Sequence, residues 1–150
     1  MENNFQRLGS RSNANVGSEF ECNVRSFFVD QHLELTPRFK IDIGVSDQKK
    51  PHEFDLGSEL PKVLVECKSH TWTKGANVPS AKITTWDQAM YYFSMSPRNF
   101  RKMFCVLRDE RSTTGETLAA YYIRLRYHLI PDAVEIWEFS PDSYSAKRLI

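Results

Sequence analysis

The chain has 150 residues, of which 41% are hydrophobic and 26% are charged, and this composition predicts one soluble domain with an ordinary core. No apolar run approaches the ~18 residues that a membrane helix needs, and no signal peptide is evident, so we expect a cytoplasmic protein without membrane partners. A net charge of +1 excludes a strongly basic protein, so any nucleic-acid surface must be local. Three widely spaced cysteines and four scattered histidines argue against a disulfide framework and a zinc site.

The first segment, residues 1–16, is rich in Asn, Ser and Arg and predicts a flexible arm. Arg7 and Arg11 could carry this arm to a phosphate backbone or to a partner subunit. Residues 17–150 show no internal repeat and no linker, so they are expected to form a single domain.

Hydrophobic periodicity predicts a helix, three strands, a helix, a strand, a helix and a last strand. The expected ranges are a helix over 18–31, strands over 33–45, 52–56 and 62–70, a helix over 79–95, a strand over 103–107, a helix opening near 113 and a strand around 134–137. Ser18 with Glu21, and Thr113 with Glu116, have the spacing of capping boxes. Three consecutive strands followed by crossover helices predict an α/β fold, with a mixed sheet flanked by helices on both faces.

The candidate chemistry lies on the second and third strands. Asp55 is expected near the end of one strand, and residues 57–61 form a turn into the next. Side chains alternate along a strand, so Glu66 and Lys68 share a face, and hairpin pairing brings Asp55 beside Glu66. Two carboxylates suit a hard divalent cation such as Mg²⁺, with the carbonyl oxygen of Cys67 as a third ligand. Lys68 would position or help deprotonate a water, or neutralise developing charge, which fits phosphodiester hydrolysis.

An acid on one strand, a turn, and an apolar strand ending in Glu-x-Lys resemble the PD-(D/E)xK nuclease superfamily. This group includes restriction endonucleases, Holliday junction resolvases and exonucleases of DNA repair. Asp55 stands for the first acid, although Phe54 replaces the usual proline, and Glu66 and Lys68 stand for the Glu-x-Lys pair. The resemblance covers residues 17 to about 92. It implies a restriction-endonuclease-like three-layer core and a Mg²⁺ cofactor for which Mn²⁺ can substitute.

Two further residues extend the resemblance. Many members carry a glutamate near the start of the first helix, and Glu21 fits this position by its spacing from Gly17, with Glu19 as the alternative. Glu21 would then be a catalytic and metal-binding acid. Gln88 with Tyr92 resembles the Gln-x-x-x-Tyr element of the exonuclease branch, which makes Gln88 a candidate catalytic residue.

Substrate contacts are expected from the loop that follows Lys68. The candidate DNA-binding residues in and next to this loop are His70, Trp72, Lys74 and Asn77, in addition to Arg7 and Arg11 of the arm. Phosphate contacts from such residues would position a duplex without reading its sequence.

Simpler interpretations remain for each feature. Glu66 and Lys68 could form an edge ion pair, Glu21 could serve only the helix dipole, Gln88 could be an ordinary polar residue, and the loop charges could be solvated.

These features predict a Mg²⁺-dependent DNA endonuclease of restriction or mobile-element type. A homodimer is expected, because cutting both strands with one site per subunit favours a symmetric pair. The alternatives within the superfamily are a Holliday junction resolvase and a DNA-repair nuclease. The alternative from another class is a non-catalytic module of the same fold that binds nucleic acid or a partner subunit.

Overall fold

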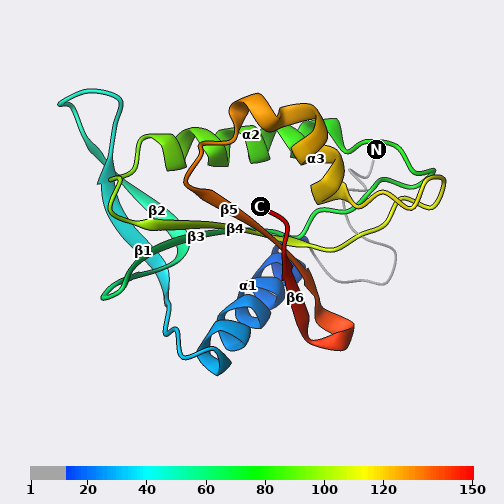
Figure 1. Cartoon of the computed structure of the whole chain (residues 1–150), viewed down its shortest axis with the longest axis horizontal. Helices are drawn as coiled ribbons and strands as arrows, with labels where there is room; N and C mark the ends of the chain where they lie inside the picture. The colour runs from blue at the N-terminus through cyan, green and yellow to red at the C-terminus, as the bar shows by residue number, and fades with distance from the viewer. Residues whose placement is uncertain (1–12) are drawn as a thin grey trace.

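The structure is a computed structural model that describes residues 13–150; Arg7, Arg11 and most of the expected arm lie outside this range. The elements in chain order are α1 (Asn13–Asp30), β1 (Thr36–Ile43), β2 (Lys50–Glu59), β3 (Lys62–Lys68), α2 (Ser80–Ser94), β4 (Arg101–Leu107), α3 (Leu118–Arg126), β5 (Val134–Ser140) and β6 (Ser145–Arg148) (Figure 1). Two short 3-10 helices, Tyr127–Leu129 and Pro141–Ser143, precede β5 and β6.

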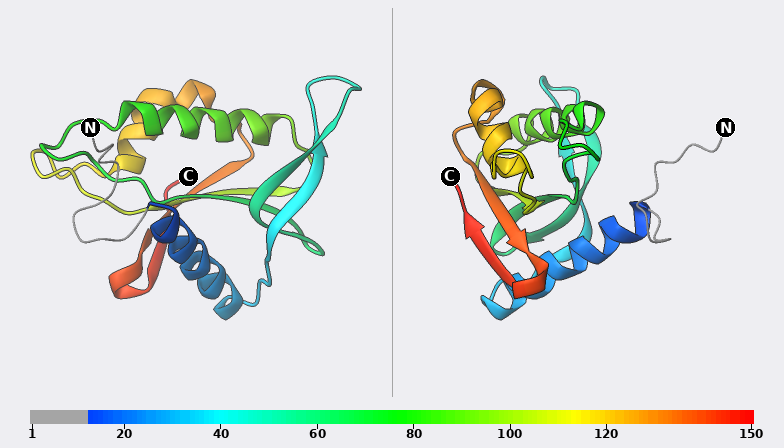
Figure 2. Two further views of the ribbon diagram at one scale, coloured as in Figure 1. Left: turned by 180° about the vertical axis from the view of Figure 1, so that it is seen from behind. Right: turned by 90° about the vertical axis from the view of Figure 1, so that its right-hand side faces the viewer.

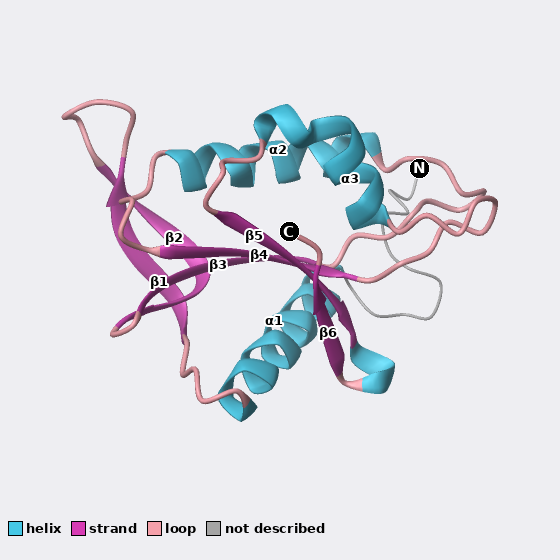
Figure 3. Cartoon of the chain, in the orientation of Figure 1, coloured by secondary structure: helices cyan, strands magenta, loops and turns pink. Residues whose placement is uncertain are grey.

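A six-stranded sheet in the order β1-β2-β3-β4-β5-β6 forms the centre of the molecule. β4 runs parallel to β3 and to β5, and the other neighbouring pairs are antiparallel. α1 covers one face of this sheet, and α2 and α3 cover the other face (Figures 1 and 3). The predicted α/β fold, a mixed sheet with helices on both faces, is confirmed.

Each face of the sheet has its own hydrophobic core, and β3 contributes to both. Val63 and Val65 pack with Val24 of α1, whereas Leu64 packs with Trp86 of α2. This alternation is the period of two expected for a strand buried on both faces. Glu66 follows Leu64 by two residues, so it continues along the α2 side of the sheet.

β2 is longer than the sequence predicts, because the segment expected to turn at residue 57 continues as strand to Glu59. Gly57 is buried in this strand, and a Cβ there would overlap the ring of Phe39 on β1. A side chain is therefore excluded by close strand packing, and the glycine does not mark a turn. The turn is confined to the two residues between Glu59 and Lys62.

β2 also changes faces in its middle. Phe54 belongs to the α2-side core and Leu56 to the α1-side core, although residues two apart normally share a face. On the paired strand, Arg38 has a left-handed backbone, with φ of 55°. Pro37 pairs with Leu56 and Phe39 with Phe54, so Arg38 and Asp55 lie between these two pairs, at the irregularity within β2.

The helix starts differ from those that capping boxes predict. α1 begins at Asn13, so Ser18 lies inside the helix and cannot cap it, and residues 13–16 of the expected arm are helical. α3 begins at Leu118, and its N-cap is Thr117, whose side chain accepts a hydrogen bond from the Ala120 N–H; Thr113 is not the cap.

The C-terminal region contains a strand that the periodicity did not reveal. β6 pairs with β5 in antiparallel fashion and forms one edge of the sheet (Figure 2). Within residues 13–150, no helix combines the length and the apolar character that crossing a membrane requires.

Candidate active site

The β2–β3 hairpin brings the two predicted acids together. The register pairs Leu56 with Val65, and one further step along both strands places Asp55 opposite Glu66. Asp55 Oδ2 accepts a hydrogen bond of 2.7 Å from the backbone N–H of Cys67. The side chain of Asp55 is therefore held across the strand pair, against the backbone that follows Glu66.

Glu66 and Lys68 form an ion pair in a largely enclosed position. Lys68 Nζ lies 3.0 Å from Glu66 Oε1, and the side chains are 20% and 12% exposed for Lys68 and Glu66. The second carboxylate oxygen, Glu66 Oε2, is buried and has no hydrogen-bond partner among the described residues. Buried carboxylate oxygens normally have partners, so this atom is placed to bind a donor or a cation.

Glu21 extends the group of carboxylates from the helix side. Burial raises its pKa, and the negative charge of Asp55 raises it further, whereas Lys68 lowers it. The first helix thus places Glu21 within electrostatic range of both Asp55 and Lys68, as the sequence predicted. Glu19 is exposed two residues earlier on the same helix.

The electrostatics of the two strand acids follow from burial and from like charge. Burial and the negative charge of Asp55 raise the pKa of Glu66 to about 7, and Lys68 together with the nearby backbone N–H of Asp55 offsets only part of this shift. Burial also raises the pKa of Asp55, against the Cys67 N–H and Lys68, which lower it. Three carboxyl groups with raised pKa values lie within electrostatic range of one lysine, so the ionised site carries an excess of negative charge.

This group has donors that suit a divalent cation, although its side chains are not arranged as a complete metal site. Within residues 13–150, no three His, Cys, Asp or Glu side chains converge in the manner of a preformed metal centre. Mg²⁺ is commonly bound by one or two carboxylates while it keeps several waters. Asp55 and Glu66 can supply these carboxylates, with Glu21 and the Cys67 carbonyl as further ligands. The unpartnered Glu66 Oε2 is the observation that fits such an ion.

Two of the predicted substrate-binding residues have structural roles instead. Trp72, predicted to contact DNA, is only 7% exposed and is therefore largely inaccessible to a substrate. Both of its N–H groups are used: the backbone donates to Asp109 Oδ2 at 2.8 Å, and Nε1 donates to the Asp109 carbonyl at 3.1 Å. His70 accepts a hydrogen bond of 2.9 Å from Trp86 Nε1 through its Nδ1, which ties His70 to the core under α2.

The remaining candidates are exposed. Lys74 and Asn77 lie on the surface of the loop between β3 and α2, where the prediction placed them. Gln88 is also exposed, and helical geometry places it on the side of α2 opposite the buried Trp86 and Phe93. The structure therefore does not bring Gln88 to the carboxylates.

His52 is a neighbour of the site that sequence analysis missed. Its ring lies 3.9 Å from the ring of Tyr92 on α2, and its Nε2 is buried without a hydrogen-bond partner among the described residues. Burial lowers the pKa of His52, which also responds to the charges of Asp55 and Lys68. Its position three residues before Asp55 was a signal, but the change of faces in β2 could not be anticipated.

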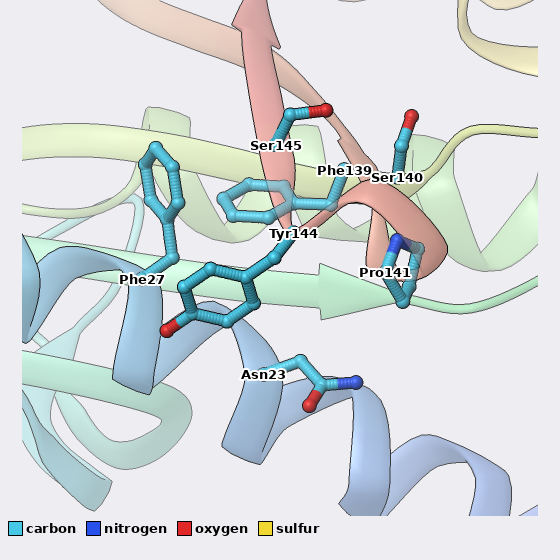
Figure 4. A pocket seen from close by; sticks show the side chains of 7 residues that line it. All are labelled: Asn23, Phe27, Phe139, Ser140, Pro141, Tyr144 and Ser145. Atoms are coloured by element: carbon cyan, nitrogen blue, oxygen red, sulfur yellow. The ribbon is translucent and has the colours of Figure 1, made fainter.

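Two hollows lie away from the carboxylates. A cavity of about 10 Å³ lies between α1 and the β5–β6 turn, where the rings of Phe27, Phe139 and Tyr144 gather (Figure 4). A larger hollow of about 440 Å³ lies between the end of α3 and the start of β5, and is lined by residues including Tyr127, Glu135 and Arg148.

Comparison with known proteins adds no relative: no family model, no curated protein and no solved structure matches this chain.

Proposed function

We propose that the protein is a metal-dependent nuclease with a PD-(D/E)xK-type site and a restriction-endonuclease-like core. The observation that carries the proposal is the buried Glu66 carboxylate next to Asp55: one oxygen accepts a hydrogen bond from Lys68 Nζ, and the other has no hydrogen-bond partner among residues 13–150. A carboxylate pair with a single lysine is costly to bury without a compensating cation. The order of acids along α1, β2 and β3 supports the same assignment.

The side chains divide the work as follows. Asp55 and Glu66 would hold the cation, and Glu66 must first lose the proton that its raised pKa retains near neutrality. A bound Mg²⁺, or Mn²⁺ in its place, would polarise a phosphoryl oxygen and make a water more acidic. Lys68 Nζ, which donates a hydrogen bond to Glu66 Oε1, would orient that water or neutralise charge that develops on the phosphate. Glu21 would complete the set from α1.

The proposed substrate is DNA, cut internally by an endonuclease of restriction or mobile-element type. The proposed assembly is a homodimer, since a symmetric pair presents one site to each strand. Sedimentation of the purified chain tests the assembly, and cleavage of linear duplex, four-way junction and single strand tests the substrate. Preferential junction cleavage would favour a resolvase.

Cleavage of supercoiled DNA tests the activity. Nicking or cutting is expected with Mg²⁺ or Mn²⁺, and none with EDTA or with Ca²⁺ alone. Glu66→Ala and Lys68→Ala should each lower the rate by about 100-fold or more, as for removal of a transition-state contact. Glu59→Ala is the matched control, because Glu59 forms an exposed pair with Lys62 in the same hairpin. Its activity should remain.

Two results would overturn the proposal. Full activity in the Glu66 or Lys68 variants would remove the mechanism. Absence of cleavage together with absence of Mg²⁺ binding in calorimetry would favour a non-catalytic module of the same fold.

A further inference from the structure

Two loops are hydrogen-bonded to each other at the end of the sheet where Lys68 lies. The loop between β3 and α2 and the loop between β4 and α3 extend side by side from this end in both views (Figures 1 and 2). They start from the carboxyl ends of the parallel strands β3 and β4. Open α/β sheets commonly bind ligands at the carboxyl ends of their strands. The two hydrogen bonds from Trp72 to Asp109 hold the loops to each other.

Arg111 of the second loop also contacts the first. Its Nε donates a hydrogen bond of 2.7 Å to the carbonyl oxygen of Ala76, and its Cζ lies 4.6 Å from the centre of the Trp72 ring. Tyr121 of α3 packs in an edge contact against the Trp72 ring on which Arg111 lies, and the two ring centres are 5.3 Å apart. The guanidinium plane of Arg111 is therefore fixed by a hydrogen bond at one nitrogen and by an aromatic face.

The two terminal nitrogens of Arg111 have no acceptor among the described residues. No carboxylate of residues 13–150 forms an ion pair with this side chain, whereas Arg108 and Arg124, its neighbours at this end of the sheet, each form one. Glu116 is near enough to Arg111 to interact with it electrostatically. Both carboxylate oxygens of Glu116, however, accept hydrogen bonds from Arg124. Arg111 is thus a cation held in a fixed orientation without an ion-pair partner in the described part of the chain.

We propose that Arg111 binds a backbone phosphate of the nucleic-acid strand that leaves the active site. A planar fork with two free donors matches the paired oxygens of a phosphate, and stacking on Trp72 removes part of the entropy cost of binding. Trp72 is four residues after Lys68, so its backbone lies within ~14 Å of extended chain from the reacting end of β3, and the fork lies against its ring. That reach corresponds to a phosphate a few nucleotides from the cleaved bond. Lys74, exposed in the same loop, adds positive charge beside it.

This inference deepens the proposed nuclease function and rests on it. Equilibrium binding of a short labelled DNA duplex, measured by fluorescence anisotropy with Ca²⁺ in place of Mg²⁺, tests it over a range of salt concentrations. Arg111→Gln should weaken binding roughly fivefold to tenfold at low salt. It should also reduce the slope of log affinity against log salt by about 1, the value for one lost phosphate contact.

Arg124→Gln is the matched control. Arg124 also lies over an aromatic ring, that of Tyr121 at 5.5 Å, but its guanidinium is paired with Glu116. The slope should not change in this variant.

Because Arg111→Gln removes the bond to Ala76 and could loosen the loop, the second arm changes the DNA. Single phosphates of the duplex are replaced one at a time by neutral methylphosphonates. One position, a few nucleotides from the cleaved bond, should weaken binding to the wild-type chain and have no further effect on Arg111→Gln.

The outcomes separate the two proposals. Unchanged slope in Arg111→Gln, or no position coupled to Arg111, overturns this inference while DNA cleavage by the wild-type chain leaves the nuclease proposal standing. Failure of the wild-type chain both to bind and to cleave DNA overturns the two together.

Discussion

At the scale of single residues, the arrangement of charge around Glu66 dominates the site. Its carboxylate is buried against Asp55, and Lys68 compensates only part of the negative charge, so its pKa stays near 7. A carboxyl group in this state destabilises the folded protein whenever it ionises without a cation. The same burial makes Glu66 sensitive to metal, because a bound cation would make the ionised carboxylate favourable for the folded state.

Glu66→Gln should change the pH dependence of stability in metal-free protein. The folded-state pKa of about 7 exceeds the ordinary value of 4.5, so between these values the folded state holds a proton that the unfolded state has lost. Stability therefore falls as pH rises from about 4.5 to 7 and levels off above, and glutamine removes this fall. Relative to wild type, the variant should gain roughly 1–3 kcal/mol at pH 8 over its difference at pH 5.

Urea unfolding with EDTA at the two pH values measures this difference. Glu59→Gln, on the exposed end of the same hairpin, is the control and should give the same difference from wild type at both. An equal effect of Glu66→Gln at pH 5 and pH 8 would contradict the electrostatic account.

At the scale of elements, sequence patterns located strands and helices better than they located helix starts. The alternation of Val63, Leu64 and Val65 depends only on the period of a strand, and it placed Glu66 and Lys68 on one face correctly. Capping boxes are local and frequent, so neither Ser18 nor Thr113 begins a helix. β6 was missed because its four residues are mostly exposed and carry no apolar alternation.

Residues whose roles depend on contacts far along the chain were also beyond sequence reasoning. Trp72 is buried because Asp109, 37 residues later, accepts both of its N–H groups. Gln88 points away from the carboxylates because the buried side of α2 faces the sheet and Gln88 lies on the opposite, exposed side of the helix. His52 is partly buried because its ring packs on Tyr92 of α2, a contact far along the chain that no periodicity predicts.

The true cap of α3 provides a test at this scale. Thr117 Oγ1 accepts a hydrogen bond of 3.1 Å from the Ala120 N–H and donates one to Glu138, which is only 4% exposed. Thr117→Val removes the cap and leaves a buried carboxylate with fewer partners, so it should cost about 2–3 kcal/mol.

Thr113→Val is the matched comparison, because Thr113 is exposed in the preceding loop and caps nothing. It should change the free energy of unfolding by less than about 0.5 kcal/mol. Similar losses in the two variants, measured by chemical denaturation, would show that the helix starts near Thr113 after all.

At the scale of the whole molecule, the site lies where separate parts of the fold meet. Glu21 comes from the helix on one face, Asp55 from the irregular part of β2, and Glu66 and Lys68 from the central strand β3. The excess negative charge of this group arises on folding, since the packing of α1 on the sheet brings Glu21 within electrostatic range of the strand residues Asp55 and Lys68. A cation that binds there must therefore stabilise the folded state over the unfolded chain.

Divalent cations should raise the melting temperature, and the rise should grow with pH. At 100 times the dissociation constant a ligand of the folded state contributes about 2.7 kcal/mol, which corresponds to roughly 5–10 °C for a chain of this length. Protons compete with the cation for Glu66, whose pKa is about 7, so at a fixed concentration of Mn²⁺ or Mg²⁺ the shift should be larger at pH 8 than at pH 6. Thermal unfolding at matched ionic strength measures both effects. Glu66→Gln should lose most of the shift at each pH while folding normally, and Glu59→Gln should keep it. An equal shift in all three proteins would place the cation elsewhere on the molecule.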